Sequence, residues 1–332
     1  MPESQQMSKK LSIAIPTYNR LVYLKECINS ILNQTFQDFS IFVFDNASDE
    51  PVEEELKKFN DERIHFIGSD KNMPQVENFK RVKNYPFQSE YLVVFHDDDA
   101  MHPKMLELQI SFLDKNKDMV FVVSKFNRIY GKYISKFQDF PEDKIKYIIY
   151  KNNYEFTKAT MLWLEYAFNS AMYRTKFYDV IDFSTFSDFA SLVSVIEVSQ
   201  NGPCALIDAP LVNYRIHSGQ DWRVLKGNHE EGAINTISFF RENFPVVLTK
   251  KDEKFFRKYS LNFLIRSCAD INKGFLDFLR FMKRCRQKNL IKYSHFRYID
   301  MRGIVSMISI IFKRKRIFDA ARSFRNFFIK SQ

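Results

Sequence analysis

The stretch from Tyr91 to Pro103 reads YLVVFHDDDAMHP and decides the fold class. Five apolar residues are followed by His96, by three consecutive carboxylates, and four residues later by a proline. A short apolar run is typical of a buried strand, and a proline is typical of the first turn of a helix. The stretch therefore predicts a strand over residues 91–95, an acidic turn over residues 97–99, and a helix that begins near residue 103.

The same alternation of strand and helix extends through the first 125 residues. Apolar runs predict further strands, and apolar residues three or four positions apart predict helices. The predicted strands span residues 11–15, 40–44, 64–67 and 119–123, and the predicted helices span residues 21–32, 51–59 and 75–82. Short strands that alternate with helices indicate βαβ units, and so an α/β fold with a mostly parallel sheet.

Three polar segments follow predicted strands, at residues 16–20, 45–48 and 96–99. Ligands of open α/β sheets bind beyond the carboxyl ends of the strands, so these segments are expected to form the site. None of the chain's 8 glycines lies between residues 1 and 67. Glycine-rich phosphate loops of nucleotidyltransferases, dehydrogenases and P-loop enzymes are therefore disfavoured.

The three consecutive carboxylates repel one another and therefore need a cation or an exposed setting. Carboxylate oxygens suit Mn²⁺ or Mg²⁺, which commonly bridge protein carboxylates and substrate phosphates. The alternative is a solvated acidic loop that also caps the following helix. Asp45 can hydrogen-bond a base or a ribose, although Asp, Asn and Ser are also common in turns and helix caps.

Taken together, six motifs resemble the family 2 glycosyltransferases of GT-A type, of the kind that builds bacterial surface polysaccharide or lipooligosaccharide. Order and spacing agree over about residues 9–220. The motifs are IAIPTYNR (13–20), FDNAS (44–48), DKNMPQVENFKR (70–81), FHDDDAMHP (95–103), SDFASL (187–192) and YRIHS (214–218). The resemblance implies a GT-A-type mostly parallel sheet flanked by helices, with a helical region at the C-terminal end.

The resemblance also implies roles for individual residues around a nucleotide-sugar donor. Asp97 would contact the ribose. The other implied donor contacts are Asp45 on the base, Pro16, Tyr18 and Arg20 shaping the same pocket, and Asn72 and Asn78 lining the donor site.

The remaining implied roles concern the metal and the acceptor. Asp98 would bind the metal that holds the diphosphate, with Asp99 and His217 as further metal contacts and Arg215 nearby. Asp188 would be the catalytic base. A structural loop histidine is the alternative for His217, and a helix N-cap is the alternative for Asp188.

The sequence departs from the family pattern at two places. One carboxylate, Asp188, remains where the family usually has an acidic pair, and His96 stands where the family's acidic motif usually begins with Asp.

These roles imply an inverting, metal-dependent transferase that uses a nucleotide sugar, by default a UDP-sugar, and a glycan or lipid-linked acceptor. The alternative function is a catalytically degenerate module that binds a glycan or a nucleotide.

The C-terminal third is strongly basic. From Arg241 onward there are 23 Lys and Arg against 7 Asp and Glu, a net charge of +16, whereas the first 240 residues carry −6. We predict a transferase domain over residues 1–225 and a basic helical region over residues 226–332. Apolar residues interspersed with Lys and Arg, as around Lys313 to Arg316, favour an amphipathic helix on an anionic membrane, with a packed helical hairpin as the alternative.

Composition narrows the cellular setting. The N-terminus is polar and no apolar run reaches about twenty residues, so neither a signal peptide nor a membrane-spanning helix is expected. The four cysteines lack metal-site spacing and are expected to be reduced thiols. We expect a cytoplasmic protein, peripheral on the inner face of the membrane, and no nucleic-acid partner, since no recognised motif accompanies the charge.

Overall fold

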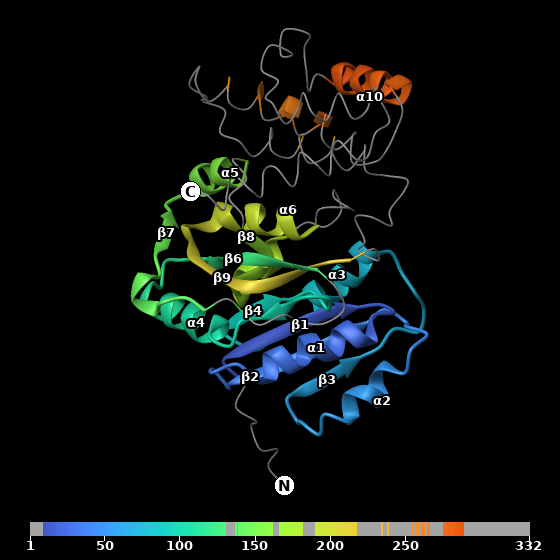
Figure 1. Cartoon of the computed structure of the whole chain (residues 1–332), viewed down its shortest axis with the longest axis vertical. Helices are drawn as coiled ribbons and strands as arrows, with labels where there is room; N and C mark the ends of the chain where they lie inside the picture. Colours follow the sequence, from blue (N-terminus) through green and yellow to red (C-terminus); the bar gives the residue numbers. More distant parts are fainter. Residues whose placement is uncertain are drawn as a thin grey trace. The chain divides into compact units, whose positions relative to one another are not determined.

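The computed structural model forms two compact units, Met1–Ser218 and Gly219–Gln332, which are described separately. It describes residues 9–130, 137, 139–161, 166–181 and 190–217, and further along residues 234, 238, 254, 257–258, 260–262, 264–265 and 275–288. Figure 1 shows the first unit as a large sheet flanked by helices.

The alternation predicted for the first 125 residues is confirmed. The elements are β1 (Leu11–Thr17), α1 (Leu21–Leu32), β2 (Phe39–Asp45), α2 (Val52–Lys57), β3 (Ile64–Ile67), α3 (Gln75–Asn84), β4 (Tyr91–Val94), β5 (Ala100–Met101), α4 (Met105–Lys115) and β6 (Phe121–Tyr130). Helix α1 shows why the apolar pattern predicts a helix. Its buried residues are spaced so that they lie on one face of the helix. They are Leu24, Cys27, Ile28 and Ile31.

Further elements complete the first unit. They are the short helix η1 (Glu142–Lys144), β7 (Tyr147–Tyr150), α5 (Asn153–Met161), β8 (Tyr166–Arg174), η2 (Thr175–Val180), α6 (Ala190–Val198), η3 (Ser199–Asn201) and β9 (Cys204–Ile216). Strand β9 continues through Pro210, where its register against β6 shifts.

Among the described residues, nine strands form one sheet, in the order β3-β2-β1-β4-β8-β6-β9-β5, with β7 also paired to β9. The first four strands in this order are parallel to one another. Strand β8 is antiparallel to both β4 and β6, and β6 is parallel to β9. The expected α/β architecture with a mostly parallel sheet is therefore present, and β8, β5 and β7 are the strands that run the other way.

Helices cover both faces of this sheet. Alternate strand residues such as Ile41 and Val43 pack with α1, α2 and α4 in one buried cluster. Their neighbours on β2 face the opposite side, where Phe42 and Phe44 contact aromatic residues just after α3. Because successive strand side chains point to opposite faces, an almost wholly apolar strand such as FSIFVFD supplies both layers at once.

The strand register brings the three predicted polar segments to one edge. Thr17 is paired with Asp45, and Ala14 is paired with Val94. Continuing the second register for three residues sets Asp97 opposite Thr17, and their side chains are hydrogen-bonded. The carboxyl ends of β1, β2 and β4 therefore meet, as expected for a parallel block.

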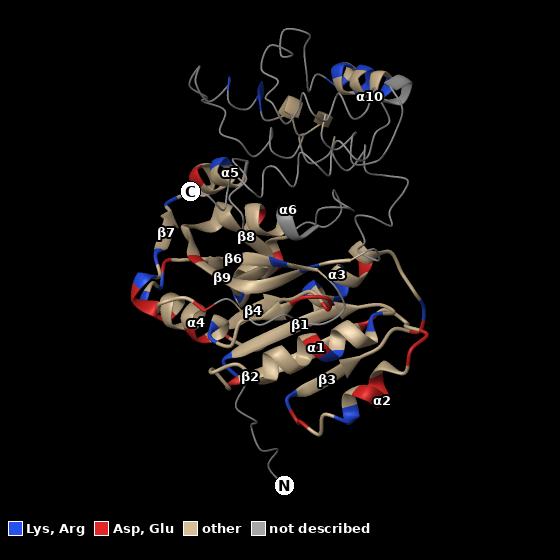
Figure 2. Cartoon of the chain, in the orientation of Figure 1, with Lys and Arg blue, Asp and Glu red and all other residues tan. Residues whose placement is uncertain are grey.

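In the second unit the longest described helix is α10 (Phe275–Gln287). Phe278, Phe281, Met282 and Cys285 are buried on it, while Arg280, Lys283, Arg284 and Arg286 are exposed. Figure 2 shows basic positions of α10 in blue. The helix is amphipathic, as the pattern predicts.

Lys313 to Arg316 lie outside the described residues. In the part of the chain that is described, no helix is long and apolar enough to cross a membrane.

Candidate functional site

The site is built around the acidic turn, defined as Asp97, Asp98 and Asp99, which follows β4. All three side chains are almost completely buried. Asp97 accepts a hydrogen bond from Thr17 Oγ1 at 2.7 Å and contacts Arg20 Nη1 at 3.2 Å. The end of β1 and the start of α1 therefore hold this carboxylate.

Asp98 lies between the side chains of His217 and Arg20. Its Oδ2 atom is 3.0 Å from His217 Nε2 and 3.4 Å from Arg20 Nη1. Its main-chain oxygen accepts a hydrogen bond from Arg215 Nε at 2.8 Å, and Arg215 in turn pairs with Glu26 of α1. Residues that are far apart in the sequence, Glu26 and Arg215, thus hold the backbone of the acidic turn in place.

Asp99 is fully buried and has hydrogen-bond donors on both carboxylate oxygens. The backbone N–H of Arg215 donates to Oδ1, and Asn169 Nδ2 donates to Oδ2, each at 2.7 Å. These bonds join the turn to β9 and β8. Asp99 therefore anchors the turn, and its predicted role as a metal ligand remains a prediction.

The three carboxylates differ in their affinity for protons. Burial raises the pKa of Asp97 to about 7, although Arg20 lowers it. Burial, followed by the charge of Asp98, raises the pKa of Asp99 well above its ordinary value. Burial also opposes ionisation of Asp98, but the hydrogen bond with His217 and the charges of His96 and Arg20 hold the pKa of Asp98 below its ordinary value. Asp98 is therefore the carboxylate that ionises first.

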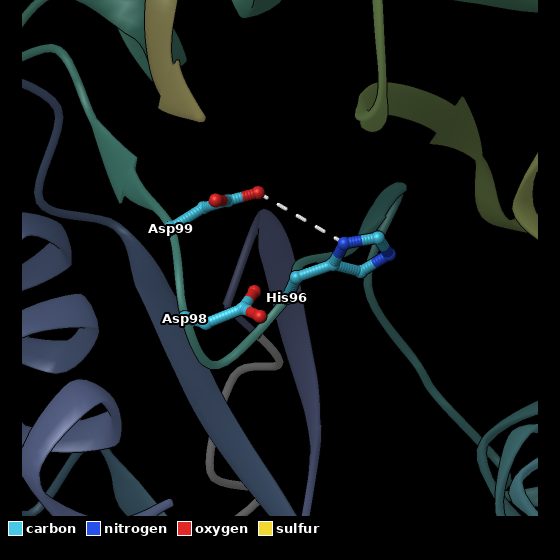
Figure 3. Close-up of side chains that lie close together, drawn as sticks. All are labelled: His96, Asp98 and Asp99. Atoms are coloured by element: carbon cyan, nitrogen blue, oxygen red, sulfur yellow. Dashed lines mark ion pairs between the residues drawn. The ribbon is translucent and has the colours of Figure 1, made fainter. Parts of the chain in front are cut away.

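A divalent cation fits this group of side chains. Ligand atoms of His96, Asp98 and Asp99 all lie within 4.8 Å of one another, and Figure 3 shows these three residues on one turn. Ligands on opposite sides of a bound Mg²⁺ are about 4.2 Å apart, twice the usual metal–oxygen distance. The carboxylate oxygens of this group suit both Mn²⁺ and Mg²⁺.

The turn after β2 faces the same edge of the sheet. Asp45 accepts hydrogen bonds from the backbone and hydroxyl of Ser48, at 3.1 and 2.6 Å. Ala47 has a φ of 59°, a left-handed conformation that costs an alanine about 1 kcal/mol or more. Asn19 donates its backbone N–H to Ser48 Oγ. The loops after β1 and β2 are thus fastened together in a defined shape.

The remaining predicted donor residues lie around these loops. Asn78 donates to the main-chain oxygen of Phe44 and accepts from Arg81, and so supports the end of β2 from α3. Asn72 donates to the main-chain oxygen of Asn46. Tyr18 is 42% exposed, while Pro16 lies within β1. Arg20, expected at the base pocket, has its guanidinium on the acidic turn.

Asp188, the predicted catalytic base, lies outside the described residues. Helix α6, whose described bounds are Ala190–Val198, begins two residues later. The roles assigned to Asp45, Asn72, Asn78, Asp97 and the other site residues remain predictions.

Sequence reasoning missed several residues that shape the turn. Thr17 lies within a quoted motif, but nothing marks its hydroxyl as a partner of Asp97. Asn169 and Glu26 carry no local signal, since their contacts are 70 and 189 positions away in the chain. Arg215 did carry a signal: it alternates with Leu211 and Asn213 on the buried face of β9, and a charged residue at such a position needs a buried partner.

Comparisons with known proteins agree on the family that the chain resembles. The model for glycosyl transferase family 2 matches residues 12–181. An uncharacterized glycosyltransferase of Methanocaldococcus jannaschii is 36% identical over 124 residues, covering 36% of this chain and 42% of that protein. One from Haemophilus influenzae is 24% identical over 258 residues, covering 72% and 75%. The GalNAc(5)-diNAcBac-PP-undecaprenol beta-1,3-glucosyltransferase of Campylobacter jejuni is 39% identical over 93 residues, covering 27% and 29%.

Among solved structures, S. aureus TarS 1-349 in complex with UDP-GlcNAc has a TM-score of 0.55 at 12% identity, covering 95% of this chain and 92% of that chain. This likeness supports the GT-A-type fold and no more. The chain spans less than half the length of several curated relatives that it matches. It covers 42% of the M. jannaschii relative and 18% of a relative from Rickettsia bellii.

Proposed function

The chain belongs to glycosyl transferase family 2, and from this membership we propose that it transfers a sugar from a nucleotide sugar to an acceptor hydroxyl, with inversion at the anomeric carbon. The observation that carries the proposal is the acidic turn itself. It is buried, it lies where three parallel strands end, and it is bonded to Thr17, Arg20 and His217.

Asp98, with His217 and His96 beside it, is the proposed anchor for the diphosphate end of the donor through Mn²⁺ or Mg²⁺. A divalent cation there offsets the negative charge that grows on the departing diphosphate. Asp97 is proposed to contact the ribose, and Asp45 the base, with Tyr18 beside it. The family resemblance implies these assignments, and the order of the three strand ends along the sheet edge is compatible with them.

Asp188 is the proposed catalytic base. The acceptor hydroxyl has a pKa far above neutral, so a base must take its proton as it attacks. The acceptor oxygen forms a bond to the anomeric carbon, the bond from that carbon to the diphosphate oxygen breaks, and the proton goes to Asp188. A single displacement of this kind inverts the anomeric centre.

A UDP-sugar is the first donor to test, and a lipid-linked surface glycan is the first acceptor class. The fold resembles that of TarS, which was solved with UDP-GlcNAc. The name of the C. jejuni relative specifies an undecaprenol-linked substrate.

Release of nucleoside diphosphate from nucleotide sugars tests this function directly. We expect one donor to be consumed with Mn²⁺ and none to be consumed with excess chelator, because the acidic turn repels an uncompensated diphosphate. The alternative, a degenerate module, would bind nucleotide without turning it over.

The basic C-terminal region is proposed to bind an anionic membrane surface, which would bring the enzyme to a lipid-linked acceptor. Exposed basic side chains on α10 and the net charge of +16 after residue 240 support this proposal. Each Lys or Arg near an anionic surface contributes about 1 kcal/mol to binding.

Deletion of residues 302–332 is expected to shift the protein from sedimenting with vesicles to the supernatant. The measurement is co-sedimentation with vesicles of phosphatidylglycerol and phosphatidylcholine at low salt, since this attraction is screened by salt. Purely phosphatidylcholine vesicles are the control for charge. Equal partitioning of full-length and shortened protein would remove membrane binding by this segment.

A further inference from the structure

Arg20 lies in an unusual position for a residue beside a metal site. Its Nη1 atom contacts Asp97 Oδ1 at 3.2 Å and Asp98 Oδ2 at 3.4 Å, and 17% of its side chain is exposed. The guanidinium thus bridges two of the three carboxylates. It holds a positive charge next to the carboxylate that the proposed metal would need.

The other nearby arginine has a different task. Arg215 is fully buried, bonds the backbone of the acidic turn, pairs with Glu26, and stacks over Tyr23 at 4.7 Å. Its guanidinium is held by α1 and the turn together, so it cannot leave without breaking the core. Arg20 directly precedes α1, in the loop after β1, and is reached by solvent.

A divalent cation on Asp98 would repel the Arg20 guanidinium, because like charges a few ångströms apart at a partly buried site interact strongly. The same guanidinium is a planar fork that suits two phosphate oxygens. Its loop faces the strand edge where the donor is proposed to lie. A displaced Arg20 would therefore meet the diphosphate that arrives with the cation.

We propose that Arg20 is an exchanging counter-cation: it neutralises Asp97 and Asp98 in the metal-free enzyme and transfers to the donor's diphosphate when the divalent cation binds. It is thus a positioning residue that weakens binding of the metal alone and strengthens binding of nucleotide with metal. This inference rests on the proposed function, because it requires a cation and a diphosphate at this site.

The test is a pair of titrations on the full-length chain. Mn²⁺ alone is titrated by the loss of the free-ion electron paramagnetic resonance signal, and UDP is titrated calorimetrically in saturating Mn²⁺. In Arg20→Gln, Mn²⁺ is expected to bind about tenfold more tightly and UDP about tenfold more weakly. If Arg20 had only a structural role, the substitution would weaken binding of both Mn²⁺ and UDP. Tighter Mn²⁺ binding together with weaker UDP binding is therefore the result that supports the exchange.

Arg20→Lys is the second variant, in case loss of the charge prevents folding. It keeps the positive charge, so Mn²⁺ affinity is expected to stay within about twofold, while UDP binds more weakly because an ammonium lacks the fork. Arg63→Gln is the matched control. Arg63 contacts Asp61 and Gln37, away from the acidic turn, and neither affinity should change.

The outcomes separate this inference from the proposed function. If the wild-type chain binds no Mn²⁺ and no nucleoside diphosphate, the metal-dependent function fails and the exchange fails with it. If the wild-type chain binds both, and Arg20→Gln weakens both or changes neither, the exchange alone is overturned. Where the donor belongs to another nucleotide, that nucleoside diphosphate replaces UDP in the titration.

Discussion

Asp98→Asn is expected to reduce Mn²⁺-dependent release of nucleoside diphosphate at least about 1,000-fold, or about 4 kcal/mol of transition-state stabilisation. The substitution keeps the shape of the side chain and removes its charge. Asp98 is the carboxylate whose pKa is held below its ordinary value, although burial opposes this, because His217 is hydrogen-bonded to it and His96 and Arg20 are nearby. It is therefore the carboxylate of the turn that most readily stays ionised, as a metal ligand must be.

Two further variants serve as a control and a comparison for Asp98→Asn. Asp118→Asn makes the same chemical change on an exposed loop after α4 and should retain full activity. Asp188→Asn should lose turnover but keep nucleotide binding with Mn²⁺, because it removes only the proposed base. Turnover by Asp98→Asn at the wild-type rate would refute metal anchoring by this residue.

Arg174→Met is expected to destabilise the first unit by about 3 kcal/mol, because several buried oxygens would lose their donor. The guanidinium donates to the main-chain oxygens of Leu113, Asn116 and Met119 at 2.7 to 3.1 Å. These oxygens lie in the last turn of α4 and in the loop to β6, so a single side chain closes the end of a helix. Its contact with Glu90 adds little, since Glu90 is exposed.

The measurement is the thermal melting of wild-type and variant protein followed by tryptophan and tyrosine fluorescence. Lys57→Met is the control, because it breaks an exposed ion pair with Glu53 on α2 and should leave the melting temperature unchanged. An Arg174→Met melting curve that overlays the wild type would show that water replaces the guanidinium at these carbonyls.

Much of the parallel block could be predicted from the sequence because each strand and helix there has a clear period. The run YLVVF has no polar residue to interrupt it, and the turn after it is marked by its charges. Residues at the carboxyl ends of neighbouring parallel strands must lie together. The meeting of Thr17, Asn19 and Arg20 with the loops after β2 and β4 follows from that rule.

The other half of the sheet could not be predicted in this way. Strand β8 lies between β4 and β6 although it follows both in the chain, and apolar alternation does not specify which strand it pairs with. Nor does a local pattern reveal Asn169 on Asp99. Nor does a local pattern place the Arg20 guanidinium on the acidic turn, where the buried carboxylates attract it.

The most direct test of metal-dependent sugar transfer is release of nucleotide from a panel of UDP-, GDP-, CDP- and dTDP-sugars, with Mn²⁺ and with excess chelator. Wild-type protein is compared with Asp98→Asn in each reaction. We predict release from one donor by the wild type, only with Mn²⁺, and a loss of that release in the variant. Release that survives thorough chelation, or that the variant retains, would contradict the central role of the acidic turn.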